Sequence, residues 1–481
     1  MKKMVIVIWL LISTNVAFGQ NIEDALRFSS SNAIISARAG GLGTSYLGIA
    51  DDYSSLAFNP AGIALIDKGE ISVGFGFMAN KTETSFIGTV NPLNTNDAYM
   101  SNFGIVAPFK TDAGNAAIAI GHYMESNFDN SMDFEAFNPY SSYIKSIADN
   151  AYENGLAWDE NLASYLWLSD DYNYTPVKDR VYQQAMISEN GGLHNLTGGI
   201  AFELTQFLSA GFSLTGKWGT YEYLRDYKES DVNNIYQNFD YDYDSVNNKY
   251  SFYDLDFSEF RVDEYIKQDI SGVTGAFGIQ GKVENFMRFG FTIQFPTAYD
   301  ISERFSQKGV SYFDNGDKKD TNYNYENYYS FTSPWIFSGG LSFHFEGLTI
   351  TSGVEFSDLK QMEFTDANFD LKEINLDIKR LMSNRLKWGI GLEYEIPFLP
   401  VSVRGSYNST TAPYENDIDG AEIISAAFGM GIYLAPNVRL DALGRWSQYS
   451  NMWNIYSGNW ETELVFKRSV LDFGLQLTYR Y

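Results

Sequence analysis

The feature that most constrains this chain is a two-residue alternation of apolar and polar side chains that recurs along most of its length. Such a period places successive side chains on opposite faces of a β-strand. The clearest case lies at 471–481, where every second position is apolar or aromatic: Leu471, Phe473, Leu475, Leu477, Tyr479 and Tyr481. The positions between them are polar or glycine. The pattern therefore predicts strands that each have one apolar face.

Fourteen segments follow this pattern, and the connections between them alternate between short and long. The segments are roughly 70–79, 100–108, 115–126, 193–204, 208–224, 270–282, 286–299, 334–345, 348–357, 386–396, 401–409, 422–434, 437–448 and 467–481. Membrane-spanning up-and-down barrels have an even number of strands, with short turns at one rim and long loops at the other. We therefore predict an all-β fold, a transmembrane antiparallel barrel of about fourteen strands over 70–481. Long extracellular loops are expected at 127–192, 225–269 and 300–333.

Composition narrows the compartment and the partners. Residues 1–19 have a basic start, an apolar run and a small-residue site at Ala17-Phe18-Gly19, which indicates a signal peptide. No later run is long and apolar enough for a spanning helix, so we expect a cell outer membrane location and contact with its lipids. The formal net charge of −26 argues against nucleic-acid partners. The aromatic terminal strand ending at Tyr481 resembles the signal that the barrel-assembly machinery reads during biogenesis.

The residues that carry chemistry in many enzymes are scarce. The chain has no cysteine, and its three histidines, His122, His194 and His344, fall in separate predicted strands without a metal-ligand pattern. No nucleophile motif accompanies them. Acidic stretches near 240–244 and 314–320 are suggestive of calcium, but solvated acidic loops explain them better. We therefore expect no enzymatic activity, no catalytic residue, no cofactor and no metal site.

Residues 20–69 lack a long alternating run and read as a separate N-terminal segment. They contain Ala37-Arg38-Ala39-Gly40-Gly41, then Ala50-Asp51-Asp52, then Asn59-Pro60-Ala61-Gly62. This order resembles the N-terminal hatch of the FadL family of long-chain fatty-acid transporters, whose barrels have fourteen strands. The resemblance implies a hatch over 20–69 that plugs the lumen, with Asn59, Pro60 and Ala61 as its motif. Because Pro60 restricts the preceding residue, Asn59 is expected to bond backbone groups across a turn.

The resemblance also implies a function and a route. It implies passive uptake of hydrophobic molecules such as long-chain fatty acids, caught by surface loops and released sideways through a gap at the third strand. Gly114 and Gly121 of that strand are candidates for interrupting its pairing. A ligand carboxylate would need a lumenal cation. By alternation, the lumenal candidates are Lys217, Arg288, Lys387, Arg404, Arg439 and Arg445.

A second role stays open at this stage. The family also includes non-transport barrels of protein-secretion systems, and the tyrosine-rich acidic loops could bind a secreted cargo protein. A haem receptor is less consistent with the isolated histidines. Within 127–192, segments 141–154 and 159–169 are expected to form short amphipathic helices. The sequence does not choose the ligand, the role, or the oligomeric state.

Overall fold

The wall of the molecule is one closed antiparallel sheet. The computed structural model describes residues 22–481, except 33, 113, 154–161, 170–174, 238–239, 245–248, 254–255, 285, 368–370 and 457–461, so the expected signal peptide at 1–19 lies outside it. The wall strands are β1 Glu70–Phe86, β2 Thr89–Thr111, β3 Gly114–Asn127, β4 Asn130–Asn138, β5 Val181–Thr205, β6 Leu208–Ser230, β9 Phe257–Val283, β10 Met287–Gln294, β11 Ala298–Phe313, β12 Lys318–Thr332, β13 Ile336–Phe345, β14 Leu348–Asp358, β15 Glu363–Thr365, β16 Asn384–Glu395, β17 Val401–Thr410, β18 Ile423–Ala435, β19 Val438–Asn454 and β20 Glu463–Arg480.

These eighteen strands make a barrel of fourteen, as the sequence predicts. Four neighbouring pairs continue one another across a short interruption: β3 with β4, β10 with β11, β12 with β13, and β14 with β15. The second and third interruptions contain Pro296 and Pro334, which cannot donate to a ladder. The barrel closes between its first and last strands, whose register runs from Glu70 opposite Arg480 to Ser85 opposite Val465.

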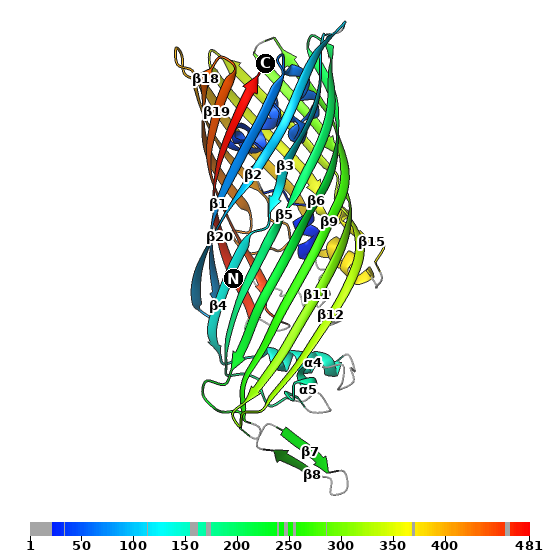
Figure 1. Cartoon of the computed structure of the whole chain (residues 1–481), viewed down its shortest axis with the longest axis vertical. Coiled ribbons are helices and arrows are strands. Elements are labelled where there is room, and N and C mark those ends of the chain that lie inside the picture. Colours follow the sequence, from blue (N-terminus) through cyan, green and yellow to red (C-terminus); the bar gives the residue numbers. More distant parts are fainter. Residues whose placement is uncertain are drawn as a thin grey trace, which may run out of the picture.

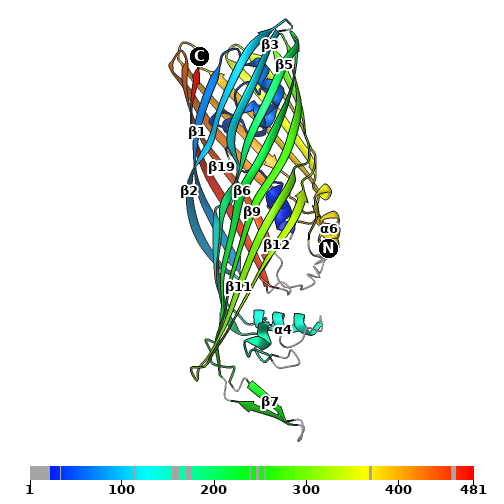
Figure 2. The same cartoon turned by 45° about the vertical axis from the view of Figure 1, so that its right-hand side comes forward.

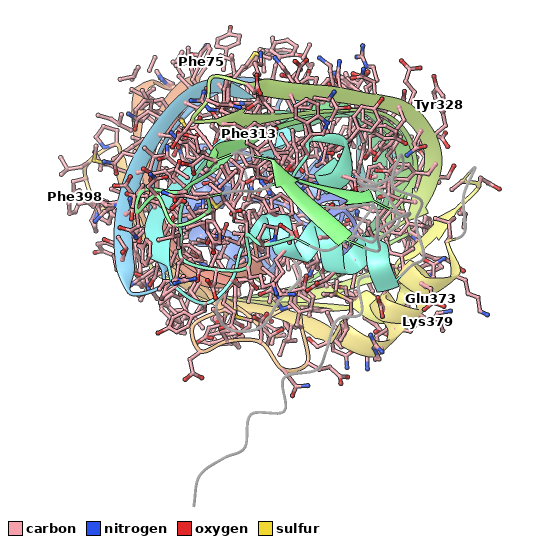
Figure 3. The ribbon with its side chains drawn as sticks, turned by 90° about the horizontal axis from the view of Figure 1, so that it is seen from below. Phe75, Phe313, Tyr328, Glu373, Lys379 and Phe398 are labelled. Atoms are coloured by element: carbon pink, nitrogen blue, oxygen red, sulfur yellow. The ribbon has the colours of Figure 1, made fainter. Side chains whose placement is uncertain are left out.

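The outer face carries the apolar band that the alternation predicts. Exposed apolar side chains cover it on every side, among them Phe75, Ile118, Leu214, Phe277, Phe291, Leu341, Ile390, Met430, Phe473 and Leu475. Figure 3 shows Phe75 and Phe398 pointing away from the barrel axis. Exposed tryptophans lie on the outer face of β6, β16 and β19 and just before β13: Trp218, Trp388, Trp446 and Trp335. A band flanked by aromatic residues is typical of a lipid-facing wall.

The expected long loops are largely strands. β1 and β2 continue through 80–99 and meet at a tight turn, where Ile87 and Gly88 both have positive φ (46° and 81°). β11 and β12 likewise fill most of 300–333, and β6 and β9 extend far into 225–269. The alternation of apolar and polar residues ends where the strands extend beyond the apolar band, because a strand in water needs no apolar face. The hydrogen bonds between these strands continue, so the barrel extends far beyond the apolar band at the end that carries the long connections, which we call the long end (Figure 1).

The long end carries a small cap. The expected helices in 127–192 are present as α4 Tyr143–Glu153 and α5 Leu162–Tyr165, and β7 Asp240–Asp244 pairs with β8 Lys249–Tyr253 beyond them (Figure 1). On the side of the barrel, the 3₁₀ helix η4 Leu359–Gln361 and the helix α6 Lys372–Leu381 connect β14, β15 and β16 (Figure 2). No helix among the described residues is long and apolar enough to cross a membrane.

The N-terminal segment lies inside the barrel (Figures 1 and 2). It consists of α1 Ile22–Phe28, α2 Ala37–Leu42, the 3₁₀ helix η1 Gly43–Gly48, α3 Ser55–Phe58 and the 3₁₀ helix η2 Pro60–Leu65. Inward glycines of the wall make room for it. The ring of Tyr53 occupies the space where Gly104 and Gly121 would carry a Cβ, at 1.8 and 2.3 Å from those positions. A larger residue at either glycine would displace that ring.

A matched pair of substitutions on β6 tests where lipid contacts the wall. Leu214 and Leu224 both point outward and are exposed by 56% and 45%. Leu214→Arg should reduce the free energy of unfolding by ~2–4 kcal/mol in lipid vesicles, because a charge is then held in the apolar band. Leu224→Arg should change it by less than about 0.5 kcal/mol, since this position lies six residues beyond Trp218, in water. Denaturant titrations in vesicles measure both, and equal losses would contradict the placement of the band.

Candidate functional site

The part of the lumen toward the long end of the barrel is an apolar chamber that surrounds α1. Its wall consists of side chains from β5, β6, β9, β11 and β12 and from the β14–β16 connection, including Leu193, Tyr221, Ile270, Tyr299, Ile301, Tyr329, Phe331, Leu359, Met362 and Phe364. The ring of Phe28 lies 5.8 Å from the rings of both Tyr299 and Phe331. Ala25 and Phe28 are buried there. The chamber therefore has the chemistry to hold an apolar group, and α1 fills it in this structure.

Polar contacts also hold α1: Gln268 donates to Asp24 at 3.3 Å, and the Tyr299 hydroxyl donates to the backbone carbonyl of Phe28 at 3.0 Å. Arg27 pairs with Asp24 and places its guanidinium 3.6 Å from the centre of the Tyr221 ring. After α1, the backbone carbonyl of Ser29 accepts a hydrogen bond from Arg385 at 2.6 Å. Apolar packing and these directed contacts together keep α1 in the chamber.

The part of the N-terminal segment from α2 to η2, which we call its base, is held by a buried network of charges. Arg38 pairs with Asp51 and with Glu393, at 2.8 Å from the latter, and Arg288 pairs with Asp51 at 2.8 Å. Burial raises the pKa of the Asp51 carboxyl, but Arg38 and Arg288 outweigh this effect and hold that pKa below its ordinary value. Arg38 and Asp51 thus tie the predicted hatch to the wall.

All the predicted lumenal cations have carboxylate partners. Arg404 pairs with Glu393 and Asp441, Arg439 with Asp441, Lys387 with Glu355, Lys217 with Glu125, and Arg445 with Asp472. Lys217 lies nearest the chamber, because its ammonium group also donates to the Tyr299 hydroxyl at 3.2 Å. A role for these cations in ligand contact stays a prediction. A ligand carboxylate would have to compete with an existing partner at each of them.

The Asn59-Pro60-Ala61 motif joins the segment to β9. Asn59 is fully buried, and its side-chain oxygen accepts from the amide of Ala61 at 3.1 Å, which caps η2. Its side-chain nitrogen donates to the carbonyl of Ile279 and to Gln280, both at 2.9 Å. Gly278 allows this approach, since a Cβ there would lie 2.1 Å from the Asn59 oxygen. Asn59 therefore bonds across the turn, as expected, and also to the wall.

The wall has one break in its pairing, between β2 and β3. These strands pair from Thr111 opposite Gly114 to Asn102 opposite Tyr123. Beyond that point, among the described residues, 89–101 of β2 pair with β1 alone. β3 shifts register at Met124 and continues with β4 along β5 instead. β4 turns toward the lumen, where Phe134 packs against Phe86 of β1 at 4.8 Å between ring centres.

The break does not lie at the two glycines predicted to interrupt this strand. Gly121 pairs with both Gly104 of β2 and Thr197 of β5, and Gly114 begins the strand with a φ of 142°. The strand itself is the one expected. Its interruption comes instead from the register shift next to Glu125, whose side chain is drawn inward by Lys217. Nothing in the hydropathy pattern marks this position.

The described residues 29–32 and 34–35 of the N-terminal segment cover the break; we call them the linker. Asn32 donates its backbone amide to the carbonyl of Glu125 at 3.2 Å, and its side chain bonds both backbone groups of Asn127. On the β2 side, Asn102 donates to the carbonyl of Ile35 at 2.8 Å. The linker therefore satisfies edges that the wall leaves open, and it connects α1 to the base.

Two of the histidines meet on the outer wall. The Nε2 atom of His122 lies 3.2 Å from Nδ1 of His194, whereas His344 bonds Ser342 and Thr349 elsewhere. The contact depends on the register between β3 and β5, which the sequence alone does not give. Among the described residues, no three side chains of His, Asp or Glu form a metal cluster. The predicted calcium-like stretch at 240–244 lies in β7, whose side chains are outside the description.

Several solved structures share this fold. No protein-family model and no curated protein sequence matches the chain. A FadL homologue from Pseudomonas aeruginosa superposes with a TM-score of 0.58 at 11% identity, covering 94% of this chain and 99% of that one. The toluene transporter TodX of P. putida gives 0.56 at 12% identity, with 94% and 99% coverage. The toluene transporter TbuX of Ralstonia pickettii gives 0.51 at 12% identity, with 93% and 98% coverage. The chain therefore has the fold of FadL-type channels, as the motifs in its N-terminal segment indicate.

Two cations of the lumen should differ sharply in their contribution to stability. The Arg404 side chain is fully buried between Glu393 and Asp441, at 3.1 and 2.7 Å. Arg404→Gln should cost about 3 kcal/mol of unfolding free energy, because it removes the cation that two buried carboxylates share and leaves Glu393 with Arg38 and Asp441 with Arg439 as their remaining partners. Lys387 and Glu355 are each 21% exposed, so Lys387→Gln should cost no more than about 1 kcal/mol. Denaturant unfolding in vesicles compares them, and equal costs would contradict a dry ion network at the base.

Proposed function

We propose that this protein is an outer-membrane channel for the passive uptake of hydrophobic molecules. The observation that carries the proposal is the position of the linker. It directly follows α1, which fills the apolar chamber, and it covers the break between β2 and β3. Displacement of α1 by an apolar ligand would pull on the linker directly, since the two are consecutive in the chain. Filling the chamber and opening the wall would thus be one event.

The proposed route begins at the long end, which we assign to the cell surface, with the short turns in the periplasm. A ligand enters the chamber and replaces the apolar contacts of Phe28 with its own. The linker then releases the edges at Glu125–Asn127 and Asn102, and the ligand leaves through the break. Transfer of apolar surface out of water drives entry, and no chemical reaction is required. The proposal includes no catalytic role.

The chamber favours uncharged or weakly polar ligands. Its wall is aromatic and aliphatic, and the two cations beside it already have carboxylate partners: Arg27 pairs with Asp24, and Lys217 pairs with Glu125 at 2.7 Å. A fatty acid remains a ligand to test, but its carboxylate would have to break that pair. Two of the similar structures are those of toluene transporters. Uptake of toluene and of oleate into cells that carry the channel should therefore be compared directly.

Identification of bound molecules provides the first experiment. Mass spectrometry of lipids extracted from the purified protein should find apolar molecules in amounts that fall when the chamber is filled by Ala25→Trp. The alternative role, a cargo shuttle of a secretion system, predicts a co-purified secreted protein and no apolar molecule. That second result would overturn the channel proposal.

A disulfide tests the linker. The chain has no cysteine, so Asn32→Cys with Asn127→Cys introduces one pair, at positions whose side-chain and backbone atoms lie 2.9–3.1 Å apart. The oxidised double variant should lose most uptake, because the linker can no longer leave the break, and a reductant should restore it. Each single variant is the control. Full uptake with the disulfide formed would exclude release through this break.

Asn59 tests whether the base must also shift. Asn59→Ala removes the bonds to Ala61, Ile279 and Gln280, each with a net value of about 1 kcal/mol. Barrel assembly should persist, because the closed ladder is untouched. Uptake per barrel at the surface should change severalfold, since such losses can move a balanced equilibrium. Loss of assembly would instead make the motif a structural cap.

A further inference from the structure

The outer wall has a polar groove where β6, β9, β11 and β12 run side by side. Its volume is about 790 Å³, and outward side chains line it in two neighbouring rows that cross these strands. One row consists of Thr220, Asp269, Ser302 and Tyr328, and the other of Trp218, Ser271, Asp300 and Ser330. The residues between the rows, such as Ile270 and Ile301, are buried inside the barrel. The groove therefore lies outside the proposed route, and the channel proposal gives it no role.

The groove lies at the border between the apolar band and water. The next row toward the short turns is apolar, with Leu196 and Val273 exposed by 48% and 50%. The next row toward the long end is charged throughout: Glu222, Lys267, Arg304 and Glu326. Lipid headgroups lie at such a border, where aromatic residues also gather. A molecule that reaches the groove from the membrane therefore presents its headgroup to it.

Two aromatic rings stand at the two ends of the groove, and small polar residues form its floor. Trp218 on β6 has the ring of His194 stacked beside it, at 5.9 Å between ring centres. Tyr328 on β12 is exposed by 61% and points away from the barrel axis (Figure 3). Between the rings, Ser330 donates to Asp300 at 2.8 Å. A ring-shaped headgroup can therefore lie between two aromatic side chains, over hydroxyls and carboxylates.

The carboxylates of the groove decide the chemistry of that headgroup. Asp269 and Asp300 only accept hydrogen bonds, and Asp366 after β15 adds a third carboxylate to the lining. Among the described residues, these three have one ion-pair partner, Arg304, at 3.4 Å from Asp269. A lipid phosphate brings negative charge, which these carboxylates repel. A sugar instead brings several hydroxyl donors on an uncharged ring, and the C–H groups on its face pack against aromatic side chains.

We propose that this groove binds the sugar headgroup of a glycolipid in the outer leaflet of the membrane. The sugar lies between Trp218 and Tyr328, its hydroxyls donate to Asp269 and Asp300, and its acyl chains follow the apolar row below. The choice of leaflet rests on the orientation proposed above, with the long end at the cell surface. The choice of sugar does not depend on transport, so binding and uptake can fail independently.

Native mass spectrometry of the full chain in detergent tests the proposal with lipids that share the same palmitoyl chains and differ in headgroup. The digalactosyl lipid should bind as one molecule per chain, at least tenfold more tightly than phosphatidylglycerol or phosphatidylethanolamine. Trp218→Leu and Ser271→Leu should each weaken binding of the digalactosyl lipid at least tenfold. The first change removes an aromatic ring, and the second fills the floor of the groove, while both keep the wall apolar.

Trp446→Leu is the matched control, since Trp446 is also an exposed tryptophan but lies on β19. It should bind the digalactosyl lipid as the unmodified chain does. Heat-modifiable migration in gels verifies that each variant is folded. The proposal is overturned if either phospholipid binds as tightly as the digalactosyl lipid, or if Trp218→Leu and Ser271→Leu bind it as the unmodified chain does. Displacement of the lipid by equimolar lactose would also overturn it, because the groove would then take a soluble sugar.

Discussion

The closure of the hydrogen-bonded ladder between β1 and β20 is the constraint on which the rest of the molecule depends. Lipid offers no partner to a backbone amide or carbonyl, so only a closed sheet can cross it. Closure also fixes which side of every strand faces outward. The apolar positions, such as Leu475, then contact lipid, while Asp441, Asp472 and Arg404 are forced into the lumen. Buried charges need partners, and the N-terminal segment supplies some of them.

The break between β2 and β3 is the exception that this constraint allows. The break begins at Asn102 and Tyr123, at about the height of the exposed Trp218 on the wall. The linker bonds the backbone edges that the break opens. A wall interruption in a membrane protein is tolerated where other protein groups bond the freed backbone. The same linker therefore has a structural task, which is to bond the backbone groups that the break leaves open.

The two ends of the N-terminal segment are held by different forces. Its base is tied to the wall by Arg38, Asp51 and Asn59 through charges and directed bonds that fix position closely. Its α1 end combines polar contacts with the apolar contacts of Phe28, which are non-directional and can be replaced by those of another apolar molecule. In the proposed channel, the α1 end would move aside for a ligand while the base stays bonded to the wall.

The sequence alone determined the strand number, the faces of the strands and the resemblance of 36–62 to the FadL hatch, because these follow from local alternation and from contiguous motifs. It did not reveal that the polar segments 80–99 and 300–333 continue the ladder, since a strand in water shows no apolar period. Only the tertiary structure decided the break beside Glu125, the partners of Lys217 and Arg404, and the meeting of His122 with His194. Each of these depends on the register between strands that are far apart in the chain, and register is set by closure of the whole barrel.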